Sequence, residues 1–171
     1  MKRIFLAISL LPVLWAFSPS QNVQVAIFEQ LSIDVPSTFS QLDPEVLDEK
    51  YHDQPFHPVL ELHQEQDSIT LILSDNLNPL SEGEVDNLRE FYENHFKGMY
   101  PNAVWLDTKT VDINSLPVAY LETSNQGEYY LVFFTAVDGR QIHIAISAKS
   151  ENLDRVRETS RGIMESLKKR G

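Results

Sequence analysis

The sequence has 171 residues, about the size of one domain, and carries 14 Lys and Arg against 25 Asp and Glu. A net charge of −11 argues against electrostatic binding to nucleic acid or to an anionic membrane. The absence of cysteine excludes disulfides, thiol chemistry and zinc sites built on cysteine. At 42% hydrophobic residues, the composition is that of a folded chain, and we expect one domain that is stabilised by its core alone.

The first twenty residues have the order of a secretory signal peptide. Lys2 and Arg3 precede an apolar run from Ile4 to Phe17, and small residues stand at Ser18 and Ser20. A membrane-spanning helix needs about 20 apolar residues, so the run is short for an anchor. We expect cleavage after Ser20 and an exported protein, periplasmic or secreted, that is soluble and has no stable membrane span once cleaved.

The alternative interpretation of this segment is a membrane anchor. Pro12 in the middle of the apolar run disfavours it, and no cysteine follows the run to accept the lipid of a lipoprotein. With residues 1–20 assigned to the signal peptide, residues 21–171 form the single expected domain. That domain is more acidic still, because the removed segment holds two cations and no acid.

Several segments show the apolar runs or the alternation of apolar and polar residues that strands require. They are 25–28, 31–35, 59–63, 68–74, 104–113, 118–123, 129–137 and 140–147. Residues 40–56 are polar and acidic and predict a loop, with a helical turn over 44–50 that begins at a proline. Residues 75–79 are rich in Asp, Asn and Pro and predict a turn.

The dipeptide Asp138-Gly139 between two strand segments is the strongest short signal for a hairpin. A two-residue turn at this place pairs Val137 with Arg140 and, further along, Phe133 with Ile144. The same register gathers one set of apolar side chains on the core face of the sheet. They are Leu131, Phe133, Ile142, Ile144 and Ile146.

Two segments have the periodicity of amphipathic helices. The first follows Ser81 and Glu84, which are spaced as a capping box, and ends near Gly98 and Pro101. The second covers 152–169 and ends in cations, which suit the negative end of a helix dipole. The sequence therefore predicts an α+β fold, with an antiparallel sheet of about six to eight strands packed with two main helices.

Histidines and acids gather between residues 52 and 63, where a metal site could form. The candidate ligands are His52, Asp53, Glu61 and His63. Because a strand rises about 3.3 Å per residue, His57 and His63 would lie about 20 Å apart and could not share one ion. The remaining pairs fall short of the three or four ligands that zinc needs, so surface imidazoles are the simpler interpretation. We predict no cofactor and keep a metal-binding protein as the alternative.

The sequence contains no nucleophile elbow, no metalloprotease helix, no phosphate-binding glycine loop and no EF-hand loop. His143 lies opposite Phe134 in the predicted hairpin, where a single histidine is more often a half-buried packing residue than a catalyst. A hydrolase is the least supported class. We therefore predict no catalytic residues and a protein that is not an enzyme.

The strand at 129–137 has a second apolar face, formed by Tyr130, Val132 and Phe134. Two interpretations of this face stay open at the level of sequence. Either helices cover both faces of the sheet, or this face binds a partner. We keep these three side chains as candidate partner-binding residues.

Three segments carry a family resemblance. Residues 31–36 read Leu-Ser-Ile-Asp-Val-Pro and are followed by Phe39, residues 111–118 read Val-Asp-Ile-Asn-Ser-Leu-Pro-Val, and residues 163–167 read Ile-Met-Glu-Ser-Leu. Together they resemble motifs of the PsbP-like superfamily, which includes the bacterial DcrB-like proteins. In that pattern a Trp is common where Phe39 stands, and a Gly where Ser115 stands.

The resemblance implies an α/β/α sandwich around an antiparallel sheet. It also implies a non-catalytic binding, accessory or chaperone role, and it carries over no catalytic residue. We therefore expect an exported accessory or binding module of the cell envelope, with an unknown protein partner and no nucleic-acid partner.

Overall fold

The computed structural model describes residues 21–54, 57–149 and 152–170. The predicted signal peptide, residues 1–20, lies outside these ranges. Within them, no helix has the length and apolar character needed to cross a membrane.

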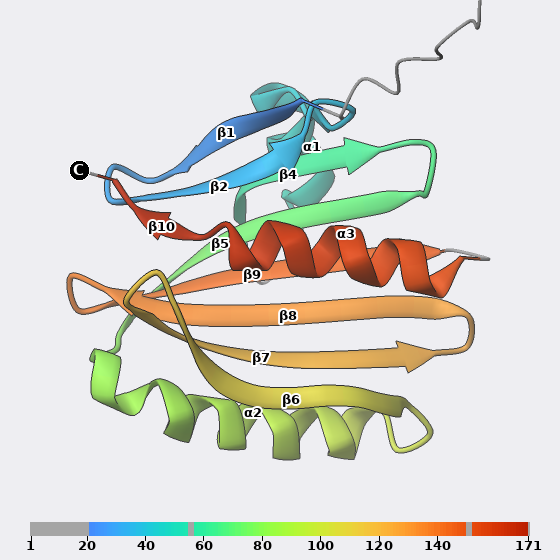
Figure 1. The fold of residues 1–171 in the computed structure, drawn as a ribbon. Helices are drawn as coiled ribbons and strands as arrows, with labels where there is room; N and C mark the ends of the chain where they lie inside the picture. Colours follow the sequence, from blue (N-terminus) through green and yellow to red (C-terminus); the bar gives the residue numbers. More distant parts are fainter. Residues whose placement is uncertain (1–20, 55–56, 150–151, 171) are drawn as a thin grey trace, which may run out of the picture.

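The described residues form ten strands and three α-helices (Figure 1). The strands are β1 (Asn22–Ile27), β2 (Leu31–Pro36), β3 (Ser40–Gln41), β4 (Pro58–Gln64), β5 (Ile69–Pro79), β6 (Val104–Ile113), β7 (Leu116–Asn125), β8 (Glu128–Val137), β9 (Arg140–Lys149) and β10 (Lys168–Lys169). The helices are α1 (Pro44–Tyr51), α2 (Val85–Met99) and α3 (Leu153–Glu165), and a short 3-10 turn, Glu82–Glu84, leads into α2.

The strands form two antiparallel sheets. The large sheet has seven strands in the order β3-β4-β5-β9-β8-β7-β6, and the small sheet has the order β1-β2-β10. Phe133 on β8 packs in one core cluster with Val156 of α3, whereas its neighbour Phe134 packs in a second cluster with Val85 of α2. Because successive side chains of a strand point to opposite faces, the two helices cover opposite faces of the large sheet. The predicted α/β/α sandwich is confirmed.

The predicted register of the β8–β9 hairpin is also confirmed. Phe133 pairs with Ile144, and Val137 pairs with Arg140. Both turn residues between these strands have positive φ, 51° and 75°, as a type I′ turn requires. All the apolar side chains predicted for the core face of this hairpin lie in the larger core cluster.

The C-terminal helix is shorter than the sequence predicts. It ends at Glu165, and residues 168–169 leave it to form β10 along β2. The backbone N–H of Asp34 donates to Ser166 Oγ at 2.8 Å, and the Lys168 ammonium pairs with the Asp34 carboxylate at 2.9 Å. These contacts with β2 replace the helix-dipole interaction that the sequence suggested for the terminal cations.

The turn predicted at 75–79 is wrong, because β5 continues through this segment to Pro79. The pairing with β9 shifts register between Asp75 and Pro79, so an irregularity in the ladder accommodates the turn-forming residues. The helical turn predicted over 44–50 is present as α1. Its N-cap is Asp43, whose carboxylate accepts a hydrogen bond of 2.9 Å from the backbone N–H of Glu45.

Candidate functional site

The two faces of β9, the middle strand of the large sheet, are covered to different extents. The side chains that point toward α3 are at most 5% exposed, and they are Ile142, Ile144, Ile146 and Ala148. On the α2 face, His143, Ala145 and Ser147 are only half-buried. A half-buried alanine at the centre of a seven-stranded sheet means that α2 does not seal this face.

A cavity of about 390 Å³ lies at this place, between the C-terminal part of α2 and the sheet. Ligand-binding pockets typically measure about 300–1,000 Å³, so the cavity is large enough for a small molecule. Phe96 and Trp105 line it from α2 and β6, and Val132 and Ala145 line it from β8 and β9. Among the described residues that line it, none is Asp, Glu, Lys or Arg.

His143 lines the cavity, and its ring packs against two other rings. The ring centroids lie 5.9 Å from that of Tyr92 and 6.5 Å from that of Phe134, with small interplanar angles. Its Nε2 atom is buried and has no hydrogen-bond partner within the described part of the chain. Burial lowers the pKa of His143 to about 4, so the imidazole is neutral at pH 7. Since buried polar atoms are nearly always hydrogen-bonded, Nε2 marks a position where a partner is missing.

The mouth of the cavity carries exposed apolar side chains. Tyr100 lines the cavity and is 46% exposed, and Met99, the residue before it, is 48% exposed. Tyr130 also lines the cavity, and its phenol donates to the Glu128 carboxylate, which raises the pKa of Tyr130 to about 12. The opening is therefore apolar and aromatic, with phenol hydroxyls at its edge.

The structure separates the three predicted partner-binding residues. Phe134 is 1% exposed and packs under α2, with its ring centroid 5.3 Å from that of Tyr92. Val132 and Tyr130 instead line the cavity. A helix thus covers the second face at Phe134, as the first interpretation required. Partner binding at Tyr130 and Val132 stays a prediction.

The predicted metal ligands are only partly brought together. Glu61 is fully buried, accepts hydrogen bonds from Lys50 (2.6 Å) and the Tyr51 phenol (2.8 Å), and pairs with His63. Burial alone would raise the pKa of Glu61, but these hydrogen bonds outweigh it and hold the pKa below its usual value.

The other two candidate ligands, His52 and Asp53, are exposed after α1. Among the residues that the structure describes, no three His, Asp or Glu side chains gather as a metal site. Metal binding rests on the Glu61–His63 pair and stays a prediction.

A second buried carboxylate, Glu122 on β7, was not anticipated from the sequence. Arg157 of α3 donates to both of its oxygens at 2.8 and 3.0 Å, Arg161 also binds it, and the Tyr129 phenol donates at 2.9 Å. Arg161 extends the network to Asp107 at 2.8 Å. In this network the two carboxylates are paired with the two arginines, and these ion pairs anchor α3 to the sheet. The available signal was an acid inside an apolar strand and two arginines four residues apart on a helix.

No family model matches the sequence, and neither does any curated protein. Among solved structures, the fold is similar to the solution structure of cyanobacterial PsbP (CyanoP) from Synechocystis, with a TM-score of 0.59 and 12% identity over 89% of this chain and 94% of that chain. A crystal structure from Bacteroides thetaiotaomicron gives a TM-score of 0.47 and 11% identity over 82% of this chain and 45% of that chain. The chain therefore has a PsbP-like fold, as its sequence motifs implied.

Proposed function

We propose that the protein is an exported, non-catalytic accessory or binding module of the cell envelope that recognises a protein partner. One observation carries this proposal. Tyr100, which lines the cavity together with Tyr130 and Val132, exposes its large apolar side chain, and so does Met99, the residue before it at the end of α2. Grouped apolar exposure of this kind is typical of interaction sites, and Tyr and Met are enriched in protein interfaces.

The non-catalytic part of the proposal is supported by the state of the buried charged groups. Glu61 and Glu122 each accept hydrogen bonds from a cation and from a tyrosine. A carboxylate held in this way is stabilised in its charged form and is poorly suited to exchange protons with a substrate. Both are better explained as structural anchors of α1 and α3.

A photo-crosslinking amino acid at Tyr100 tests the partner surface in cells that export the protein. We expect a discrete adduct from position 100 and none from position 158, where Glu158 is exposed on α3. Adding Met99→Asp should remove the adduct, because it places a charge beside Tyr100 while the fold, checked by circular dichroism, is kept. Equal adducts from both positions, or an adduct that survives Met99→Asp, would contradict the proposed surface.

Export is tested by the N-terminus of the mature protein. N-terminal sequencing or intact-mass measurement of exported material should give a chain that begins at Gln21. Full-length protein retained in the membrane would overturn the signal-peptide prediction and favour an anchor.

The second candidate function is metal binding at His52, Asp53, Glu61 and His63, and the contact between Glu61 and His63 is the observation that favours it. It predicts a stoichiometric metal in purified protein and a rise in melting temperature with zinc, copper or manganese, because a ligand of the folded state stabilises that state. Loss of the rise in His63→Ala would support it. Metal-free protein with no such rise would remove it.

A further inference from the structure

The cavity beside α2 has the lining of a site for an apolar body. Phe96, Trp105 and Val132 face it, and all three belong to the apolar cluster between α2 and the sheet or pack against that cluster. An apolar cavity that stays empty forfeits contacts, so a molecule that fills it is stabilised by packing and by removal of apolar surface from water.

The space exists because a small side chain stands where larger ones surround it. Ala145 of β9 pairs with Val132 on one side and with Ile72 on the other. Ala145 remains half-buried although β9 is the central strand of the sheet. The space next to the Ala145 side chain is therefore accessible to a bound molecule.

The charge of the residues that line the cavity limits the charge of a molecule that can bind there. Charged residues make up 23% of the chain, yet none occurs among the described residues that line the cavity. An ion buried without a partner of opposite charge loses hydration that nothing replaces. A molecule that binds in this cavity must therefore be uncharged.

His143 supplies a polar contact within this lining. Its Nε2 atom is buried without a hydrogen-bond partner in the described residues, and its ring packs against those of Tyr92 and Phe134. A neutral imidazole nitrogen either accepts or donates, depending on the tautomer. A hydroxyl group can satisfy both tautomers, because it donates and accepts.

We infer that this cavity binds a small uncharged molecule with an apolar body and a hydroxyl group, and that the hydroxyl hydrogen-bonds to His143 Nε2. The inference goes beyond recognition of a protein partner and does not depend on it. The protein partner would contact the exposed side chains at the mouth, whereas the small molecule occupies the interior.

Trp105 lines the cavity, so its fluorescence can report binding of a ligand there. The chain has two tryptophans, so Trp15→Phe in the full-length protein leaves Trp105 as the only one. We would titrate this protein with para-isopropylbenzyl alcohol, para-isopropyltoluene and para-isopropylbenzoate, which differ only in carrying a hydroxymethyl, a methyl or a carboxylate group. The alcohol should change Trp105 fluorescence saturably. The hydrocarbon should bind about fivefold more weakly, because it lacks one hydrogen bond, and the carboxylate more weakly still.

Three variants locate the site. His143→Phe keeps a ring and removes the nitrogen, so the affinity for the alcohol should fall to that for the hydrocarbon, which should itself stay unchanged. Ala145→Leu fills the space and should abolish binding of both. Phe91→Ala is the control, because Phe91 is 63% exposed and does not line the cavity, and it should change neither affinity.

Each result decides the inference. Equal binding of alcohol and hydrocarbon, or a preference for the alcohol that survives His143→Phe, would contradict the contact with Nε2. Binding that survives Ala145→Leu in a variant with an intact thermal transition would overturn the site. Cross-linking at Tyr100 measures a different interaction, so failure of that experiment and failure of this one are distinguishable.

Discussion

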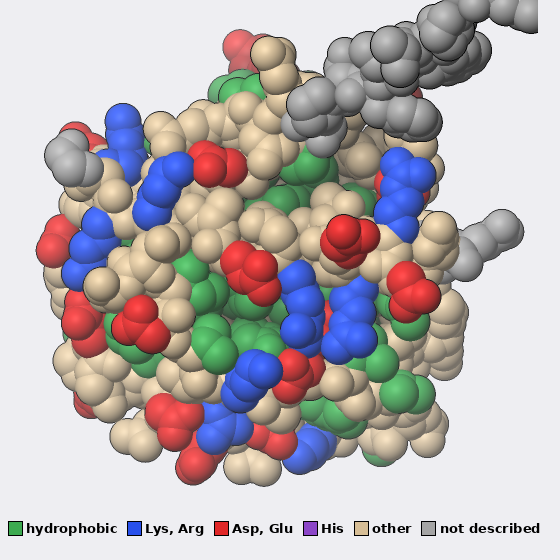
Figure 2. Space-filling model, in the orientation of Figure 1, with side chains coloured by type: hydrophobic (Ala, Val, Ile, Leu, Met, Phe, Trp, Pro, Cys, Tyr) green, Lys and Arg blue, Asp and Glu red, His purple; other side chains and the backbone are tan. Residues whose placement is uncertain are grey.

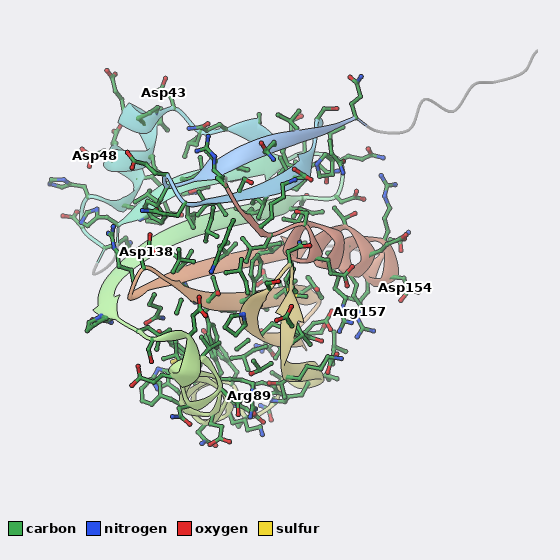
Figure 3. All side chains as sticks on the ribbon, turned by 60° about the vertical axis from the view of Figure 1, so that its left-hand side comes forward. Asp43, Asp48, Arg89, Asp138, Asp154 and Arg157 are labelled. Atoms are coloured by element: carbon green, nitrogen blue, oxygen red, sulfur yellow. The ribbon has the colours of Figure 1, made fainter. Side chains whose placement is uncertain are left out.

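The two helices that cover the large sheet are attached to it by different chemistry. α3 reaches the sheet with charge, since Arg157 and Arg161 bind the buried Glu122. α2 contacts the sheet through aromatic rings such as that of Tyr92. Its Arg89, by contrast, pairs with Asp86 and Glu93 of the same helix. Figure 3 shows Arg157 and Arg89 far apart on these two helices, and Figure 2 shows acidic and basic side chains intermingled on the face that carries α3.

The comparison shows that a helix can cover one face of a sheet without closing that face completely. Phe133 under α3 and Phe134 under α2 are each 1% exposed, so both faces are covered at β8. One strand away the faces differ, because Ile144 is buried while Ala145 borders the cavity. The face that combines apolar packing with ion pairs to α3 is closed, and the face held by aromatic packing under α2 keeps a cavity.

The largest expected effect compares Phe133→Ala with Phe134→Ala by denaturant unfolding. Each variant should lose about 3–5 kcal/mol of unfolding free energy, because each removes a fully buried aromatic ring and leaves a cavity. The loss at Phe134 should lie at the lower end, since the α2 layer already contains open space into which neighbours can relax. A small loss at Phe134 would mean that α2 does not cover this face in solution. A negligible loss at Phe133 would contradict the hairpin register.

The next effect tests the charged anchor of α3. Glu122→Gln should cost about 3 kcal/mol, because Arg157 and Arg161 would keep their charge beside a partner that has lost its own. The matched control is Glu93→Gln on α2, where the carboxylate pairs with Arg89 and Lys97 of the same helix. That change should cost less than about 1 kcal/mol, as is usual for such pairs. Equal costs in thermal or denaturant unfolding would remove the proposed difference between the helices.

Acid should weaken the two faces in different pH ranges. His143 has a pKa of about 4 in the folded protein against an ordinary value of 6.5, so the unfolded chain binds the extra proton first and stability falls between about pH 6.5 and 4. Asp107 has a pKa of about 2 in the folded protein against an ordinary value of 3.8. Burial would raise this pKa, but hydrogen bonds from Tyr120 and Arg161 lower it by more than burial raises it. Stability from Asp107 is therefore lost between about pH 4 and 2.

Unfolding free energies measured across pH separate these ranges. The His143 contribution should be at most about 3 kcal/mol and the Asp107 contribution about 2 kcal/mol, since one pKa unit corresponds to about 1.4 kcal/mol. His143→Phe should reduce the loss in the upper range alone, and Asp107→Asn should reduce the loss in the lower range, to which Glu61 and Glu122 also contribute because their pKa values are lowered. An upper range that persists in His143→Phe would show that the imidazole is not buried as described.

The parts of the fold that could be predicted are those with local causes. The β8–β9 hairpin follows from Asp138-Gly139 and from alternation along its strands, both of which lie within a short window of sequence. β10 could not be predicted, because Lys168 and Lys169 carry no strand pattern and β2 alone makes them extended. The segment 75–79 was mistaken for a turn because its Asn and Pro residues favour one locally, whereas pairing with β9 overrides that preference.

The candidate site could be predicted only in part. The second apolar face of β8 pointed to Tyr130 and Val132, and both line the cavity. The cavity itself depends on where α2 ends above the sheet and on the small size of Ala145, which are properties of tertiary packing. The pairing of Glu61 with His63 was anticipated, but its contacts with Lys50 and Tyr51 were not, and neither were the partners of Glu122, since the cations that reach a buried acid are known only from the tertiary structure.

The small sheet brings together the two ends of the described chain, and this has a consequence for the order of events during folding. The hydrogen bond between Asp34 and Ser166 joins residues 132 positions apart. Contacts between residues so far apart in sequence form slowly during folding, so β10 and the end of α3 dock late. Until residues 166–169 have docked, this edge of β2 stays unpaired and can pair with an extended segment of another chain.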